Sequence, residues 1–337
     1  MTKVAETMRR GAQTAAHTVI IGLNACIMTV GDDTPRVLVV RRDPAQRAVQ
    51  PDGLPFGPFE PERHRTLEIG LRNLVQDQTH VSLGYVEQLY TFGDRGRHEP
   101  EAGEGKRVVS VGYLALTREA KDSAGSGSWR NIYDFFPWED WRKERPSMID
   151  DLIRPRLDAW ATLADSDQRR DRARLCFGFD GLHWDEEKVL ERYELMYDAG
   201  LVLEARRDGR ALPASAPGAG EQKQFGEAMQ FDHRRILATG MGRLRGKLKY
   251  RPIVFELMDA AFTLLDLQRT VEAISGIRLH KQNFRRLVET SGLVERTGKR
   301  STKAGGRPAE EFRFRREVLR ERPAPGVRMP LRRTARL

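Results

Sequence analysis

The chain has 337 residues, of which 39% are hydrophobic and 31% charged, a composition typical of a soluble globular protein with room for two domains. No stretch approaches the roughly 18 consecutive apolar residues of a transmembrane helix. The two cysteines, Cys26 and Cys176, lie far apart and form no CxxC pattern, which argues against a disulfide framework or a zinc site. We therefore expect a cytoplasmic protein whose cysteines are reduced core residues.

The charge is unevenly distributed along the chain. Residues 240–337 contain 24 lysines and arginines and 10 acidic residues, a formal charge of +14, whereas the preceding 239 residues contain 34 basic and 38 acidic residues, a formal charge of −4. A basic third joined to a near-neutral body favours a polyanionic partner for that third. A solvated basic surface is the alternative that charge alone leaves open.

The first half of the chain alternates strand-like apolar runs with polar turns. The strand-like runs lie at 17–30, 36–42 and 107–117, and the stretch YVEQLYTFGD occupies 85–94. Gly, Asp and Pro residues join the first two runs, which predicts a hairpin. Between the second and third runs, apolar residues recur at helical spacing, at Leu67, Leu71, Leu74 and Val75. This spacing predicts an amphipathic helix preceded by a loop.

The middle of the chain is expected to be mainly helical. The aromatic run FFPWEDW at 135–141 is interpreted as a core edge that closes the first domain, with a stacking platform as the alternative. From 147 to 200 the pattern is helical, and Gly200 suits the position just after a helix C-terminus. Beyond it we predict a short strand at 201–208 and, because apolar residues are scarce, disorder at 208–224.

The basic third contains two consecutive helix patterns. Thr263 and Asp266 resemble a capping box at the start of the first helix, and Ser275-Gly276 is expected to end it. The inner faces are predicted from apolar residues, which are Leu264, Leu267, Val271 and Ile274 on the first helix and Phe284, Leu287 and Val288 on the second. Two helices joined by a short glycine-containing turn are typical of a helix-turn-helix motif.

The outer face of the second helix carries the predicted DNA contacts. These residues are Lys281, Gln282, Asn283, Arg285 and Arg286. In the major groove, arginine matches guanine edges, whereas asparagine and glutamine match adenine edges. Two further strands, at 293–297 and 310–317, enclose a basic loop that predicts a wing able to lay cations along phosphates. The cations of this loop are Lys299, Arg300, Lys303 and Arg307.

The segment 57–81 resembles a Nudix box whose metal-binding carboxylates have been replaced. Where the pattern expects Arg-Glu-apolar-x-Glu-Glu-x-Gly, the chain reads RNLVQDQT over 72–79. Mg²⁺ requires several oxygen ligands with near-octahedral geometry, whereas Asn73 and Gln76 offer only neutral amide oxygens and Asp77 stands alone. We therefore expect no catalytic residues, no metal ligands and no cofactor.

Three stretches together resemble the NrtR family, the Nudix-related transcriptional regulators of NAD metabolism. They are the degenerate box, VEQLYTFGD at 86–94, and the combination FTLLDLQ, NFRRLV and GRPA within 262–309. The resemblance implies a homodimeric repressor that binds double-stranded DNA and senses ADP-ribose or a related nucleotide. The chain departs from the family pattern in its more eroded box and in an extra helical segment at 147–224.

The resemblance also implies a fold and a set of candidate ligand residues. The expected fold class is α+β: a Nudix-like α/β/α sandwich, a helical segment, and a C-terminal winged helix-turn-helix. The expected bounds are 17–143 for the Nudix-like effector-binding domain, 144–231 for the helical insert, 232–320 for the winged-helix domain and 321–337 for a basic tail. The candidate nucleotide-binding residues are Arg41, Arg42, Glu87, Arg97 and Tyr113. A solvated strand end for the two adjacent arginines, and a structural hydrogen-bond acceptor for Glu87, stay open.

Two other functions stay open at this stage. An active Nudix hydrolase of a nucleoside diphosphate derivative would need an improvised metal site. Its available carboxylates are Glu60, Glu62, Glu68 and Asp77. The neutral amides in the box argue against it, because metal binding and water activation require charge. An RNA-associated or scaffold protein is the third possibility, and the groove-reading outer face favours DNA over it. No membrane partner is expected.

Overall fold

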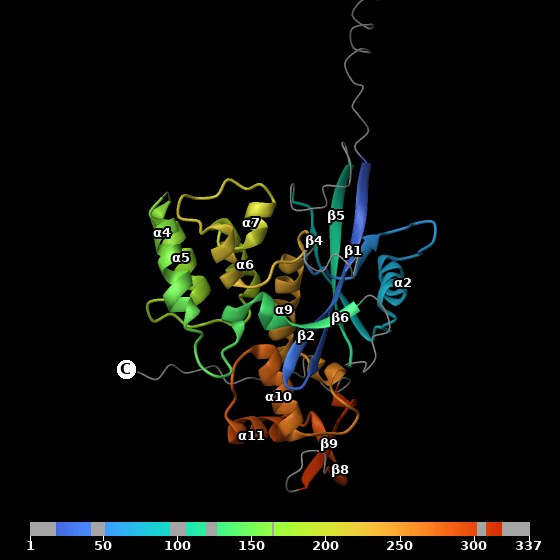
Figure 1. Cartoon of the computed structure of the whole chain (residues 1–337). Coiled ribbons are helices and arrows are strands. Elements are labelled where there is room, and N and C mark those ends of the chain that lie inside the picture. Colours follow the sequence, from blue (N-terminus) through green and yellow to red (C-terminus); the bar gives the residue numbers. More distant parts are fainter. Residues whose placement is uncertain are drawn as a thin grey trace, which may run out of the picture.

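The structure is a computed structural model that describes residues 18–41, 51–94, 106–118, 127–163, 165–301 and 308–318. Figure 1 shows three groups of elements. A sheet with α2 on one side lies beside a cluster of helices, and a small helical domain with its own short sheet lies below both. The predicted order of a sandwich, a helical segment and a winged helix-turn-helix is confirmed.

The large sheet has six strands and contains the three predicted strand runs, together with a strand in the stretch at 85–94. The strands are β1 (Thr18–Gly31), β2 (Thr34–Val40), β3 (Phe56–Pro58), β4 (Tyr85–Phe92), β5 (Lys106–Leu116) and β6 (Gly127–Asn131). Their order is β4-β5-β1-β2-β6, and β3 pairs with β1. The predicted hairpin joins β1 to β2 through Asp32 and Asp33, which both adopt positive φ, as a tight hairpin turn requires. Only the β1–β5 pairing is parallel among the described strand pairs of this sheet.

The sheet is covered on both faces, because alternate residues of a strand point to opposite sides. Leu23, Ala25 and Ile27 of β1 pack in a core with helix α2 (Leu67–Thr79). Cys26 and Met28 pack in a second core, which contains residues of helix α9 (His233–Tyr250). Figure 1 shows α2 and α9 on opposite sides of β1 and β5. This arrangement is the predicted α/β/α sandwich.

The helical segment contains the predicted helices between 147 and 200. A short helix α3 (Ile132–Phe135) and a 3-10 turn η3 (Pro137–Glu139) lead into it through the aromatic run. Its remaining elements are the π-helical turn η4 (Ile149–Ile153), α4 (Arg154–Ala161), α5 (Ser166–Phe177), α6 (Val189–Asp198), α7 (Leu203–Arg207), α8 (Ala219–Gln222) and η5 (Lys223–Phe225). Phe135, Phe136 and Trp138 are fully buried, which supports the interpretation of the aromatic run as a core edge.

Two predictions in this segment are wrong. The stretch at 201–208, expected to be a strand, forms helix α7. The stretch at 208–224, expected to be disordered, is described throughout and ends in α8. The reason is that side-chain hydrogen bonds replace the missing apolar contacts there. Buried Gln222 donates to the carbonyl oxygens of Gly200 (2.8 Å) and Val202 (3.3 Å), and Arg206 donates to that of Pro217 (3.0 Å).

The C-terminal domain is a winged helix-turn-helix. Its elements are η6 (Ile253–Leu257), β7 (Phe262–Thr263), α10 (Leu264–Ser275), α11 (Lys281–Ser291), β8 (Val294–Ser301) and β9 (Ala309–Phe314). The three strands form a sheet of order β7-β9-β8. β8 extends to Ser301, so Lys299 and Arg300, assigned to the wing loop from the sequence, lie in the strand that leads into it.

No polar gap separates this domain from the rest of the protein. One continuous apolar cluster contains Met28 of the large sheet, Met196 of α6, Leu244 of α9 and Leu267 of α10. Helix α9 packs against β1, β4, β5 and α6, although it follows the predicted domain boundary at 232. The four domain bounds therefore stay a prediction. Within the described ranges, no helix combines the length and apolar character that crossing a bilayer requires.

Candidate nucleic-acid interface and effector site

The first helix of the helix-turn-helix begins and ends as its sequence predicts. Thr263 accepts a hydrogen bond from the Asp266 amide (3.2 Å), and the Asp266 carboxylate accepts one from the Thr263 amide (2.9 Å). This reciprocal capping box satisfies backbone donors that the helix leaves free. At the other end, Gly276 adopts φ +71°, a left-handed conformation that glycine adopts without steric cost.

The second helix, α11, has one buried face and one exposed face. Phe284 and Val288, four positions apart, are buried at 2% and 1% exposure. The outer face is exposed at all five predicted positions, which are Lys281, Gln282, Asn283, Arg285 and Arg286. Because side chains at i and i+4 lie on the same face of a helix, the buried pair fixes which side α11 presents to solvent.

The cations of this surface differ from two arginines of the neighbouring strands. Lys281, Arg285, Arg286, Lys299 and Arg300 make no ion pair with any residue that the structure describes. By contrast, Arg296 pairs with Glu310 (3.3 Å) and Arg313 pairs with Glu295 (2.6 Å) across β8 and β9. Positive charge that no protein carboxylate neutralises is available for phosphates. Lys303 and Arg307, also predicted wing contacts, lie outside the described residues.

Helix α2 carries the degenerate box, and Glu68, one of its two acidic residues, is engaged with an arginine. Glu68 pairs with Arg72 (2.9 Å), which also donates to the carbonyl of Leu83 (2.6 Å). Glu60 pairs with Arg63 (2.9 Å) in the preceding loop. In the part of the chain that the structure describes, no three His, Cys, Asp or Glu side chains are grouped so that they could hold a metal ion.

Arg41, a predicted ligand residue, lies at the end of β2 and is paired. Its Nε lies 2.5 Å from Oδ1 of Asp52, whose side chain is 3% exposed, and Arg130 lies 2.5 Å from Oδ2 of the same carboxylate. Arg130 also contacts Glu227 (2.6 Å). A nucleotide phosphate at Arg41 would therefore compete with a buried carboxylate. Its neighbour Arg42 lies outside the described residues.

Glu87, a second predicted ligand residue, faces helix α9. Its carboxylate pairs with Lys247 (2.5 Å) and Arg243 (3.3 Å) and accepts a hydrogen bond from Tyr85 (2.5 Å). Burial acts to raise the pKa of Glu87, but the hydrogen bonds and positive charges outweigh it and the pKa is lowered. These contacts are those of the structural acceptor that the sequence left open.

Tyr113, a third candidate, points away from Glu87. In the β4–β5 register Glu87 lies opposite Leu114 and Gln88 lies opposite Tyr113, so Glu87 and Tyr113 occupy opposite faces of the sheet. Tyr113 is buried on the α2 face, where desolvation, followed by the charge of Glu68, raises its pKa. The fifth candidate, Arg97, lies outside the described residues. No contact joins any two of the described candidates, and their ligand role stays a prediction.

The sequence reasoning missed a buried polar cluster. Glu139, Arg192 and Arg245 form ion pairs with no solvent exposure at any of the three side chains. Two signals were available. The first is that Glu139 interrupts an aromatic run. The second is that Arg245 lies eleven residues after Arg234 on helix α9 and directly follows the apolar Leu244. Eleven residues are close to three turns of helix, so both arginines lie on the same, buried side of α9.

The C-terminal part of the chain matches a known family. The model of the NrtR DNA-binding winged helix domain matches residues 254–314, a span that contains α10, α11, β8 and β9. This part of the chain is similar to the winged helix of NrtR proteins. The helix-turn-helix and the strands of the wing lie inside the matched span, and the six-stranded sheet and the helical segment precede it.

One curated protein and two solved structures are similar to this chain. The ADPR responsive transcriptional repressor NtrR of Acinetobacter baylyi is 42% identical over 86 residues, which cover 26% of this chain and 34% of the relative. The chain thus matches about a third of that relative's length. The crystal structure of Shewanella oneidensis NrtR complexed with a 27mer DNA has a TM-score of 0.52 at 20% identity, covering 88% of this chain and 94% of that one. The crystal structure of Shewanella oneidensis NrtR has a TM-score of 0.51 at 19% identity with the same coverage. At these identities the likeness shows the fold.

Proposed function

We propose that this NrtR-like chain is a homodimeric, cytoplasmic transcriptional repressor that binds double-stranded DNA and senses a nucleotide through its Nudix-like domain. The observation that carries the proposal is the outer face of α11, whose three cations have no ion-pair partner among the described residues while Phe284 and Val288 anchor the opposite face. A helix that is anchored by one buried face and presents cations without carboxylate partners on the opposite face is suited to bind a polyanion.

The residue types on this face match the chemistry of DNA. Arg285 and Arg286 can donate bidentately to guanine edges, and Asn283 can pair with adenine. Lys299 and Arg300, on the strand leading into the wing, suit phosphate contacts that set the orientation without reading sequence. Lys281, Gln282, Lys303 and Arg307 complete the proposed set. Two such domains in a dimer would read half-sites about one DNA turn apart.

ADP-ribose is the first effector to test, because the relative from Acinetobacter baylyi is described as ADPR responsive. Arg41, Arg42, Glu87, Arg97 and Tyr113 remain the proposed ligand contacts. Arg41 contacts Asp52 and Glu87 contacts Lys247, so a nucleotide bound at either residue would share the side chain with its present partner or displace that partner.

We propose that the Nudix-like domain binds nucleotide without hydrolysing it efficiently. In support, Asn73 and Gln76 supply only amide oxygens, and the nearby carboxylates of Glu60 and Glu68 are paired with arginines. Mg²⁺ bound to a nucleotide requires carboxylates with free oxygens. Restoring the pattern with Asn73→Glu and Gln76→Glu should raise metal affinity.

Selection of genomic fragments bound by the full-length protein, with and without ADP-ribose and NAD, tests the proposal. We expect enrichment of a two-fold-symmetric site and an affinity that falls by roughly three to five decades between about 50 and 200 mM salt, as 6–10 phosphate contacts produce. Absence of binding to any duplex at low salt would overturn it.

Calorimetry with ADP-ribose, with and without the selected duplex, tests the effector. If ADP-ribose weakens DNA binding about tenfold, the DNA must weaken ADP-ribose binding by the same factor. Identical ligand affinity in both conditions would leave a nucleotide binder without a switch. Efficient Mg²⁺-dependent turnover of ADP-ribose would favour the hydrolase instead.

A further inference from the structure

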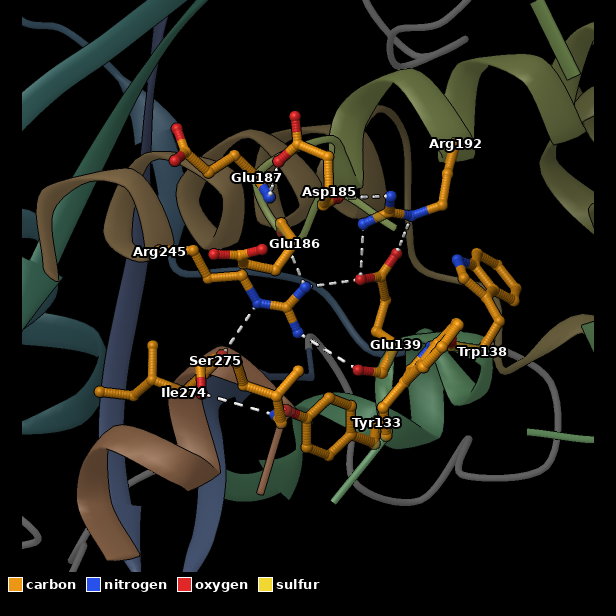
Figure 2. A network of polar contacts seen from close by, with 12 residues as sticks. Tyr133, Trp138, Glu139, Asp185, Glu186, Glu187, Arg192, Arg245, Ile274 and Ser275 are labelled. Atoms are coloured by element: carbon orange, nitrogen blue, oxygen red, sulfur yellow. Dashed lines mark hydrogen bonds and ion pairs between the residues drawn. The ribbon is translucent and has the colours of Figure 1, made fainter. Parts of the chain in front are cut away.

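One carboxylate and two guanidinium groups meet without solvent exposure where the helical segment adjoins the winged helix (Figure 2). Glu139 comes from η3, Arg192 from α6 and Arg245 from α9. Arg192 Nε lies 2.5 Å from Glu139 Oε1, and Arg192 Nη2 lies 2.9 Å from Oε2. Arg245 Nη1 lies 2.5 Å from the same Oε2. We call these three residues the buried triad.

The buried triad carries one surplus positive charge, which backbone carbonyls compensate. Arg192 donates to the carbonyl of Asp185 (2.8 Å), and Arg245 donates to that of Glu186 (2.9 Å). Burial acts to raise the pKa of Glu139, but the two guanidinium groups outweigh it and lower the pKa, so the carboxylate stays ionised. All three charges depend on one another, because each would be costly if buried alone.

Arg245 also reaches the helix-turn-helix. Its Nε donates to the carbonyl of Ile274 (2.9 Å), and the Tyr133 hydroxyl donates to that of Ala273 (2.7 Å). These carbonyls belong to the last turn of α10, where they lack partners within the helix and form the negative end of its dipole. Figure 2 shows Arg245 between Glu139 and this helix end. A cation from α9 therefore caps the first helix of the DNA-binding motif.

The turn after α10 lies directly against the same site. The Trp141 amide donates to the Gly276 carbonyl (2.7 Å). A Cβ atom on Gly276 would lie 2.3 Å from the carbonyl oxygen of Glu139 and 2.9 Å from Arg245 Nη2. Only glycine permits this close approach. The four residues 277–280 then connect Gly276 to the start of α11 at Lys281. The position of α11 is thus tied to the buried triad.

We propose that Arg245 is a positioning residue for DNA recognition, which sets the orientation of α11 relative to the Nudix-like sheet by holding the end of α10 against Glu139. This inference rests on the proposed DNA-binding function. Helix α9 makes the orientation depend on the sheet, because Arg243 and Lys247, two positions to either side of Arg245, pair with Glu87 of β4. A displacement of α9 against β4 moves the cap of α10 with it.

Arg192 supplies a matched control, because it pairs with the same carboxylate and is equally buried but contacts only the helical segment. Its other partners are the carbonyls of Cys176 and Asp185. Lysine at either position keeps the positive charge but cannot bond two acceptors in the fixed geometry of a guanidinium group. Arg192→Lys therefore disturbs two hydrogen bonds to the Glu139 carboxylate and a stacking contact with Trp184, whereas Arg245→Lys disturbs one bond to that carboxylate. Only Arg245→Lys loosens the helix-turn-helix.

The DNA experiment measures the affinity of both variants for the duplex selected by the wild type, for duplexes with the half-sites one base pair nearer or farther, and for unrelated duplex. We expect Arg245→Lys to lose about tenfold more affinity for the selected duplex than Arg192→Lys, within the usual range of site coupling. We also expect Arg245→Lys to lose less affinity than Arg192→Lys when the spacing of the half-sites is changed. The two variants should bind unrelated duplex with equal affinity. Equal losses in both variants would overturn the inference.

A second measurement does not require DNA. Spin labels at Ile69→Cys on α2 and Glu289→Cys on α11 use two exposed positions, and the native Cys26 and Cys176 are buried. We expect a narrow distance distribution in the wild type and in Arg192→Lys, and a broader or shifted one in Arg245→Lys. Tyr133→Phe, which removes the hydroxyl that contacts both the Ala273 carbonyl and Arg245, should broaden the distribution less but in the same direction.

The DNA measurement and the spin-label measurement together distinguish failure of the positioning role of Arg245 from failure of the proposed DNA-binding function. If the wild type binds no duplex, the proposed function fails and the spin-label distances alone decide whether Arg245 positions α11. If the wild type binds DNA but Arg245→Lys and Arg192→Lys give the same distances and the same affinity losses, the function stands and the positioning role is wrong. If Arg245→Lys does not fold, Tyr133→Phe decides by the same distances.

Discussion

Gly276 shows how closely the domains approach at the scale of single residues. Its backbone adopts φ +71°, and a methyl group there would lie 2.3 Å from the carbonyl oxygen of Glu139. Two separate penalties therefore apply to any other residue, left-handed strain and a steric clash with backbone.

Substitution at two glycines separates these penalties. Gly298 has φ +78° but nothing within 4 Å of its Cβ position. We expect Gly298→Ala to destabilise the protein by roughly 1–2 kcal/mol through backbone strain alone. Gly276→Ala should cost about 1–3 kcal/mol more through overpacking. Urea unfolding of both variants measures the difference, and equal losses would show that the turn can move away from Glu139.

Arg285 is the residue at which reading of bases can be tested most directly. If it contacts a base edge, Arg285→Ala should weaken binding to the selected duplex by about 1–3 kcal/mol and relax sequence preference. Arg313→Ala removes the same charge from an arginine that is paired with Glu295, and we expect it to have little effect. Titration of selected and scrambled duplexes measures both, and equal losses on the two duplexes for Arg285→Ala would mean that it touches only phosphate.

At the scale of elements, α9 connects the parts of the molecule. It covers one face of the sheet, packs against α6, and reaches α10 through Arg245. Part of its contact with β4 is electrostatic, because Arg243 and Lys247 both pair with Glu87. The strength of this contact should therefore depend on pH.

The sign of that dependence follows from the lowered pKa of Glu87. A carboxylate whose pKa is lowered by folding contributes stability above its unfolded pKa of about 4.3, and the contribution is lost as the pH falls through the folded pKa. The raised pKa of Lys247 keeps the ammonium charged throughout this range. We expect Glu87→Gln to lower the free energy of unfolding by about 1 kcal/mol near neutral pH, and the difference from the wild type to vanish in acid.

Thermal unfolding of wild type and Glu87→Gln between about pH 3 and 7 measures this difference across the carboxylate range. Glu289→Gln is the control, because Glu289 is exposed on α11 and makes no ion pair with the described residues. A difference for Glu87→Gln that persists unchanged at the lowest pH would show that the lost interaction is not the ion pair with α9.

At the scale of the whole molecule, the continuous core predicts cooperative unfolding. Met28 of the sheet, Leu244 of α9 and Leu267 of α10 belong to one apolar cluster, so loss of the winged helix would expose the core of its neighbour. Domains joined only by a linker unfold independently. We expect a single calorimetric transition whose calorimetric and van't Hoff enthalpies agree, and two resolved transitions would contradict this view of the interface.

Local structure that depends on neighbours along the chain is predictable from the sequence. The capping box of Thr263 and Asp266, the stop at Gly276 and the buried pair Phe284 and Val288 all appear as predicted. Helical and strand periods and caps are properties of short segments, so composition and spacing suffice to find them. Prediction was wrong at 201–208 and 208–224, where hydrogen bonds from distant side chains stabilise the backbone.

Which charged residues are buried depends on the packing of elements that are distant in the sequence. Glu139 lies 53 residues from Arg192 and 106 from Arg245. Glutamate and arginine are usually exposed, so residue type alone would place each of the three at the surface. Burial of a charge is favourable only when its partners arrive with it, and their arrival depends on how η3, α6 and α9 pack. The same holds for Glu87 and Tyr113, because the β4–β5 register assigns them to opposite faces of the sheet. The sequence predicted a DNA-binding helix, and the packing of α9 determined what holds that helix in place.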